Sequence, residues 1–89
     1  MLKSGPTDSA LLLTRQLLNR AIHDSLPYFQ AKAELYLGEY FLRGGIYDSS
    51  MAYLDKAGKY FSDNSNEKDL ARTLFLKSLI FKSWDQQTR

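Results

Sequence analysis

The stretch from Leu35 to Ala57, LYLGEYFLRGGIYDSSMAYLDKA, decides the fold of this chain. Apolar residues recur every three or four positions on both sides of Gly44-Gly45, which indicates two helices joined by a tight turn. Gly38 stands inside the first of these helices, where a glycine costs about 1 kcal/mol relative to alanine. We therefore expect a close contact there, in which the bare backbone at Gly38 seats a bulky side chain of the next helix, such as Leu54.

Four helices are predicted for the chain. No segment alternates apolar and polar residues between turn signals, so the predicted class is all-α. Thr7 or Asp8 can cap the first helix, and Pro27 suits the first turn of the second. The spacing from Asn66 to Asp69 resembles a capping box at the start of the fourth. The predicted helices cover about residues 8–25, 28–43, 46–61 and 67–84, in a helical domain 7–86 that follows a flexible leader, residues 1–6.

Composition limits the kinds of protein this chain can be. Its 89 residues carry a net charge of +2, and the 12 basic residues are scattered, so no phosphate-binding face is expected. No apolar segment approaches the roughly 18 residues of a membrane span. Cysteine is absent, which excludes disulfides and favours a reducing setting. We expect a soluble protein of the cytoplasm or nucleus that binds neither nucleic acid nor membrane.

The two helices around the Gly-Gly break resemble the tetratricopeptide repeat, a helix–turn–helix unit of about 34 residues. The matches are Leu37-Gly38-x2-Phe41 in the predicted helix 28–43, Gly45-x-Tyr47 in the turn, and Ser50-x3-Leu54 followed by Ala57 in the predicted helix 46–61. These positions are the expected repeat core. Two departures are that Glu34 stands where the pattern has Trp and that no Pro ends the predicted helix 46–61. The resemblance implies antiparallel helical hairpins in a right-handed stack.

An internal comparison extends the repeat. A shift of 40 residues places Leu35 on Phe75 and Gly38 on Ser78. The fourth helix then corresponds to the first helix of a following unit, and the first helix corresponds to the second helix of a preceding one. A period this long resembles the repeats of kinesin light chains, polarity adaptors and large scaffold subunits, among them the fifth subunit of the anaphase-promoting complex.

The resemblance also implies a function. Tetratricopeptide arrays bind a peptide or helix of another protein on the concave wall formed by their first helices. The implied partner-binding residues are Lys32, Tyr36, Glu39, Tyr40 and Arg43 of the second helix, and Arg72, Leu76, Leu79 and Ile80 of the fourth. The other interpretation is that these are ordinary core or solvated residues. Leu35 and Glu39 stand where chaperone-type repeats clamp a carboxylate, so that activity is not expected. The expected role is a scaffold or adaptor in a multi-subunit assembly, such as a cell-cycle ubiquitin ligase.

Leu76, Leu79 and Ile80 raise a separate question. If they face away from the third helix, something must cover them: a further helix, a second copy of the chain, or a partner. The alternative is that the first helix folds back and closes a self-contained four-helix bundle with a dimerisation or regulatory role.

No residues indicate catalysis. His23, next to Asp24, is the only histidine, and it lies near a predicted helix C-terminus, where it suits the negative end of the helix dipole. Gly44-Gly45 follows no strand and so is not a phosphate loop. We therefore expect no enzyme activity, no cofactor and no metal.

Overall fold

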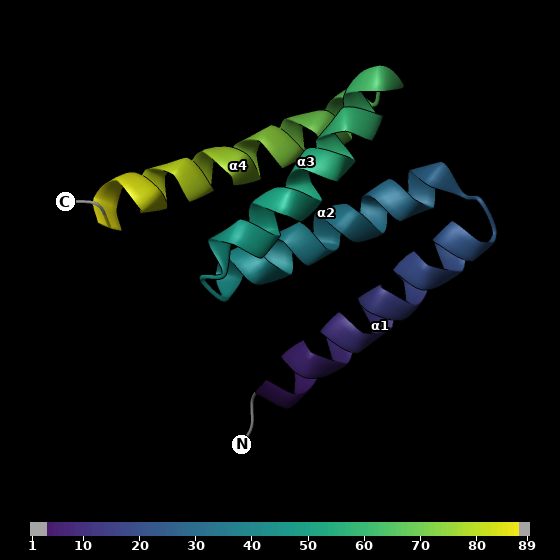
Figure 1. The fold of residues 1–89 in the computed structure, drawn as a ribbon, viewed down its shortest axis with the longest axis horizontal. Helices are drawn as coiled ribbons and strands as arrows, with labels where there is room; N and C mark the ends of the chain where they lie inside the picture. Colours follow the sequence, from purple (N-terminus) through teal and green to yellow (C-terminus); the bar gives the residue numbers. More distant parts are fainter. Residues whose placement is uncertain (1–3, 88–89) are drawn as a thin grey trace.

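The computed structural model describes the backbone of residues 4–87 and the side chains of residues 9 and 11–83. Over residues 4–87 the chain forms helices and no strands, which confirms the all-α class (Figure 1). The helices are α1 (Ser4–His23), α2 (Pro27–Arg43), α3 (Tyr47–Asp63) and α4 (Glu67–Gln87).

The start of α1 differs from the prediction. The helix begins at Ser4 and runs through Gly5 and Pro6, which were expected in the flexible leader. Proline is tolerated there because the N–H groups of the first turn have no partner within the helix. Thr7 and Asp8 therefore lie inside α1 and not at its cap; their side chains, and residues 1–3 of the expected leader, lie outside the described residues.

Three connections of three residues each join the helices, and all have the same backbone. The middle residue is left-handed in each: Ser25 with φ 55°, Gly45 with φ 77° and Ser65 with φ 57°. The N–H after it donates to a carbonyl five residues back, in the pairs Leu26–Ala21 at 2.8 Å, Ile46–Phe41 at 2.9 Å and Asn66–Phe61 at 2.9 Å. This is the Schellman closure of a helix. Because the left-handed residues stand at 25, 45 and 65, a helix and its turn repeat every 20 residues and a hairpin every 40.

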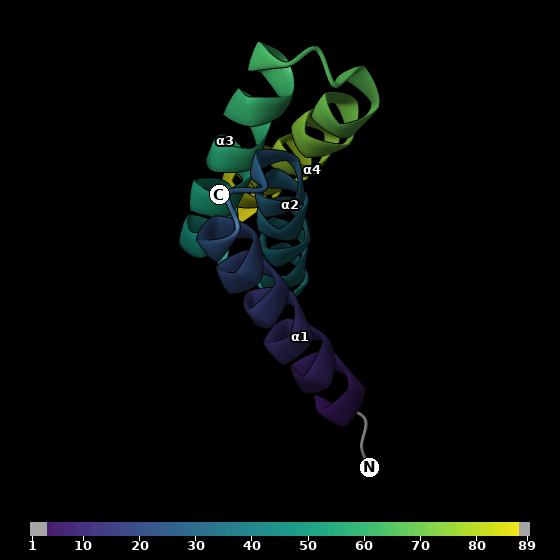
Figure 2. The ribbon, with the colours of Figure 1, turned by 90° about the vertical axis from the view of Figure 1, so that its right-hand side faces the viewer.

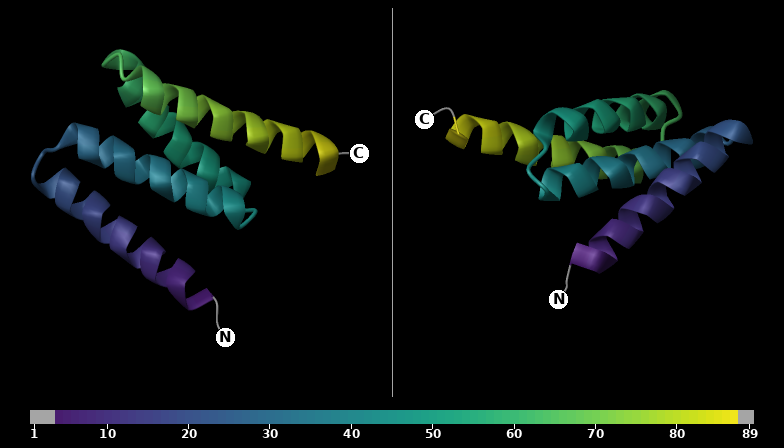
Figure 3. Two further views of the ribbon diagram at one scale, coloured as in Figure 1. Left: turned by 180° about the vertical axis from the view of Figure 1, so that it is seen from behind. Right: turned by 60° about the horizontal axis from the view of Figure 1, so that its bottom comes forward.

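The helices pack in an open stack. The α2–α3 pair has the most extensive contact; α1 packs on α2, α4 packs on α3, and α2 also touches α4. Over the described residues α1 contacts neither α3 nor α4, so the alternative of a closed four-helix bundle is wrong. The molecule is a slab of 43 × 36 × 18 Å, and 18 Å is the depth of about two helix layers. Figure 2 shows it edge-on, with α3 beside the layer of α2 and α4, and Figure 3 shows α1 at one edge and α4 at the other.

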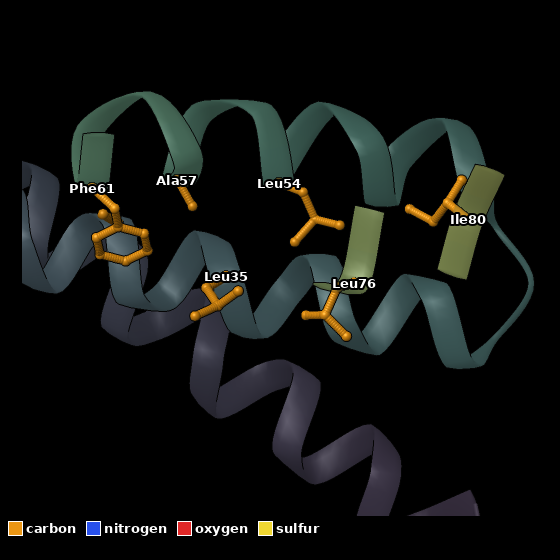
Figure 4. Close-up of a cluster of buried hydrophobic side chains, with 7 residues drawn as sticks. Leu35, Leu54, Ala57, Phe61, Leu76 and Ile80 are labelled. Atoms are coloured by element: carbon orange, nitrogen blue, oxygen red, sulfur yellow. The ribbon is translucent and has the colours of Figure 1, made fainter. Parts of the chain in front are cut away.

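The core lies between α2, α3 and α4 (Figure 4). Its buried cluster consists of Ala31, Leu35, Leu54, Ala57, Phe61, Leu76 and Ile80. Helices α1 and α4 lie at the edges of the stack, so each has one side that no other described helix covers.

The contact predicted at Gly38 is present. A Cβ atom at Gly38 would lie 2.5 Å from Leu54 Cδ2 and 2.7 Å from Leu54 Cγ, which is closer than atoms can approach. Leu54 is fully buried, so it has no room to move aside. Ser50 Oγ donates to the carbonyl oxygen of Gly38 at 2.6 Å. The missing side chain at Gly38 thus allows α2 and α3 to nest, and Ser50 adds a buried hydrogen bond across the same contact.

Candidate partner-binding surface

Charged and polar side chains join α2 to α4 along one line, which we call the α2–α4 seam: Tyr28, Lys32 and Glu39 on α2 with Asp69 and Arg72 on α4. Lys32 Nζ lies 2.9 Å from Asp69 Oδ1, and Tyr28 OH donates to Asp69 Oδ2 at 3.0 Å. Arg72 Nη2 lies 2.8 Å from Glu39 Oε2. These bonds fix how α4 lies along α2, and they occupy polar groups that a partner would otherwise have to meet.

Asp69 is the centre of the seam. Its hydrogen bond with Lys32 raises the pKa of that ammonium, because the carboxylate stabilises the charged form. Its hydrogen bond with Tyr28 likewise raises the pKa of the phenol. The predicted capping box of Asn66 and Asp69 is not formed, since Asn66 Oδ1 is buried without a hydrogen-bond partner. The carboxylate of Asp69 reaches across to α2 instead.

Several of the predicted partner-binding residues do lie together. Lys32, Glu39 and Arg72 belong to the seam, and Arg43 Nη2 lies 2.8 Å from Glu39 Oε2. Tyr36 is 49% exposed, with Lys32 Nζ 5.5 Å from the centre of its ring. Tyr40 is half-buried and packs edge-on against Phe41. Within this set, the exposed side chains are Tyr36 and Arg43 on α2 and Arg72 on α4.

The prediction that Leu76 and Ile80 are open to a partner is wrong. Leu76 is 3% exposed and Ile80 is 0% exposed, and both belong to the core cluster (Figure 4). Leu79 is half-buried against the same cluster. The reason is that α4 turns this side towards α2 and α3. The corresponding residues of α2, 40 positions earlier, are Tyr36 and Tyr40, and Tyr36 has no described helix over it.

The exposed apolar side chains lie elsewhere, and of these only Tyr36 belongs to the predicted partner-binding set. On α4 they are Leu74, Phe75 and Phe81; on α2, Phe29 and Tyr36; and on α1, Leu12, Leu13, Leu17 and Ile22. Leu74 and Phe75 are more than half exposed, at 53% and 54%. Exposed apolar side chains that lie next to one another are candidates for protein–protein contact. The signal available in the sequence was the 40-residue shift, which pairs Phe75 with the buried Leu35.

Glu34 is the residue at which the sequence departs from the repeat pattern, and its burial was not predicted. It stands where the repeat pattern has Trp, and it is 6% exposed. Gln30 Nε2 donates to Glu34 Oε2 at 3.3 Å. Lys56 and Lys59 of α3 line the same shallow pocket as Glu34, between α2 and α3. The carboxylate thus belongs to the inside of the α2–α3 hairpin and not to the surface formed with α4.

The titratable groups around His23 form a local cluster at the end of α1. His23 Nδ1 lies 2.8 Å from Asp24 Oδ1, and Arg20 Nε lies 2.8 Å from Asp24 Oδ2. The hydrogen bond with His23, and after it the one with Arg20, lowers the pKa of the Asp24 carboxyl. Among the described residues, no group of three or more His, Asp or Glu side chains could hold a metal ion. None of the helices in that part of the chain combines the length and the apolar character that crossing a membrane requires.

Comparison with known proteins gave no relative: no protein-family model matches the chain, and neither does any curated protein or solved structure.

Proposed function

We propose that this chain is a tetratricopeptide-like helical-repeat module that mediates protein–protein contacts, as a scaffold or adaptor within a larger assembly in the cytoplasm or nucleus. The observation that carries the proposal is the nesting of Leu54 on the bare backbone at Gly38, in a hairpin whose turn recurs every 20 residues. A stack of such hairpins is built to continue, and its sides bind other chains.

The exposed apolar side chains support the same proposal. Phe29 and Tyr36 on α2, and Leu74 and Phe75 on α4, lie at the two sides of the stack. Aromatic residues are the usual anchors of protein interfaces, because they bury a large area with little loss of side-chain freedom. The accessible partner surface is therefore Tyr36, Arg43 and Arg72 of the predicted set, together with Phe29, Leu74 and Phe75.

Site-specific photo-crosslinking tests this proposal. A benzoylphenylalanine would replace Tyr36 in one variant and Phe75 in another, with illumination in an extract of the source cells. We expect discrete protein adducts from both positions, with masses read by mass spectrometry. The matched control is the same probe at Ala52, an exposed position of α3 away from both surfaces. Equal labelling from all three positions, or none from Tyr36 and Phe75, would contradict the proposal.

A further inference from the structure

The outer side of α4 corresponds to a side of α2 that is covered. In α2, Ala31, Leu35 and Gly38 are buried, and Leu35 and Gly38 lie where α3 packs. The positions 40 residues later are Ala71, Phe75 and Ser78, and all three are exposed. With Leu74 they form what we call the C-terminal face. It has the layout of a surface that receives a helix like α3, although no described helix covers it.

The opposite side of the stack carries the reverse arrangement. In α3, Ala57 is fully buried and Tyr53 is half-buried; the positions 40 residues earlier on α1 are Leu17 and Leu13, which are 55% and 58% exposed. On α2, Phe29 and Tyr36 are 61% and 49% exposed. They correspond to Asp69 and Leu76 of α4, which lie against α2. We call Leu13, Leu17, Phe29 and Tyr36 the N-terminal face.

We propose that a second copy of this chain docks on the first head to tail, with its N-terminal face on the C-terminal face. The α1 helix of the arriving copy would take the place on α4 that α3 has on α2. Its α2 helix would lie beside α4 as α4 lies beside α2. This inference rests on the proposed function, because it names the partner of that same surface.

The side chains that would meet are compatible in size and charge. In place of the Gly38–Leu54 contact, Ser78 would meet Thr14. Ser78 is larger than Gly38 and Thr14 is smaller than Leu54, so the two changes in size offset each other. The Lys32–Asp69 pair would become Arg72 against Phe29, a guanidinium over an aromatic ring, which is an attractive arrangement. Arg72 is 49% exposed and Phe29 is 61% exposed, so both can be reached. A single chain therefore presents both halves of one contact.

The geometry of this contact determines the kind of assembly. The two faces differ, so a docked pair still has one free face of each kind, and association does not stop at two copies. A symmetric dimer formed by the C-terminal face on itself would stop at two.

Sedimentation of the full chain over micromolar to millimolar concentrations tests the proposal. We expect a weight-average mass that rises with concentration beyond that of two copies. Phe75→Glu and Leu17→Glu should each remove this rise, because each places a charge in one of the two faces. Ala52→Glu, on the outside of α3, is the matched control and should keep it. Circular dichroism of each variant establishes that its helices are intact.

Mixing the two single-face variants gives the decisive result. Phe75→Glu retains its N-terminal face and Leu17→Glu retains its C-terminal face, so an equimolar mixture should form a one-to-one pair and nothing larger. A monomeric wild type at all concentrations, or no pairing in the mixture, would overturn the proposal. If the crosslinks from Tyr36 and Phe75 then go to a different protein, the second copy is excluded while the proposed function stands; if no crosslinks form either, both fail.

Discussion

The α2–α3 pair and the α3–α4 pair have the same backbone plan but depend on glycine to different extents at its two critical points. Each pair is joined by a three-residue connection with a left-handed middle residue, which is Gly45 in the first pair and Ser65 in the second. Each has a glycine where its helices approach. A Cβ at Gly38 would lie 2.5 Å from Leu54 Cδ2, whereas a Cβ at Gly58 would lie 3.3 Å from Thr73 Cγ2. The first pair thus depends on glycine both in its connection and at its helix contact. The second pair has a side chain in its connection, at Ser65, and has almost enough room for one at Gly58.

The largest effect is expected at the closest contact. Gly38→Ala should lower the free energy of unfolding by about 2 kcal/mol, because overpacking a filled core costs more than the roughly 1 kcal/mol that alanine adds to helix stability. Gly38→Leu should prevent folding. Urea denaturation followed by circular dichroism measures both.

A double variant separates this contact from a general weakness of α2. If Leu54 is the obstacle, Gly38→Ala combined with Leu54→Ala should be more stable than the sum of the two single losses predicts, by about 1 kcal/mol or more. Strict additivity, or a Gly38→Ala variant as stable as the wild type, would show that α2 and α3 do not depend on this contact.

The two connections should respond with opposite signs. Gly45→Ala should lower the free energy of unfolding by about 1 kcal/mol, because a left-handed conformation strains a residue with a Cβ. Nothing lies within 4 Å of that Cβ, so the loss comes from the backbone alone. Ser65→Gly should raise the free energy of unfolding by about 0.5 kcal/mol. It relieves the same strain, but it also increases the conformational entropy of the unfolded chain, which offsets part of the gain.

Gly44→Ala is the control for this series. Gly44 has φ −83°, an ordinary helical value, so stability should change little when alanine replaces it. Thermal denaturation of the three variants side by side gives the comparison. A stabilised Gly45→Ala or a destabilised Ser65→Gly would show that the two connections differ in more than their middle residue.

Sequence patterns predicted the local features of these pairs and not their placement in the stack. The Gly38–Leu54 contact and the turn at Gly45 follow from spacing within about 20 residues, and both are confirmed. The burial of Leu76 and Ile80 was not foreseen. Apolar periodicity shows that α4 has an apolar side, but the direction of that side depends on the seam to α2.

The seam offers a smaller effect that also depends on pH. Replacing Lys32 by Met and Asp69 by Asn, singly and together, should give a coupling energy of about 1 kcal/mol, as expected for a partly buried, hydrogen-bonded ion pair. Asp69 raises the pKa of Lys32 in the folded chain. The stabilisation should therefore be complete below the ordinary lysine pKa and be lost as the pH rises through the raised value.

The Lys77–Asp55 pair between α3 and α4 is the matched control. Its Nζ–Oδ1 distance is 2.7 Å, but Asp55 is 57% exposed against 19% for Asp69. Replacing Lys77 by Met and Asp55 by Asn, singly and together, should give less than half the coupling energy of the Lys32–Asp69 pair, because solvent screens the more exposed charges. Equal coupling in the two cycles would mean that burial at the seam adds nothing to the attachment of α4.

The smallest effect is expected at Gly58. Alanine there should gain about 1 kcal/mol in helix stability and lose a similar amount against Thr73 Cγ2, so that the net change stays within about 0.5 kcal/mol. Thr73 is fully buried, and its Oγ1 donates to the carbonyl of Asp69 at 2.8 Å, which holds its methyl group in place. Removing that methyl by Thr73→Ser should uncover the gain, so Gly58→Ala should stabilise the Thr73→Ser background by about 1 kcal/mol. A loss at Gly58 as large as that at Gly38 would instead show that α3 and α4 nest as closely as α2 and α3, and that glycine is required at both contacts.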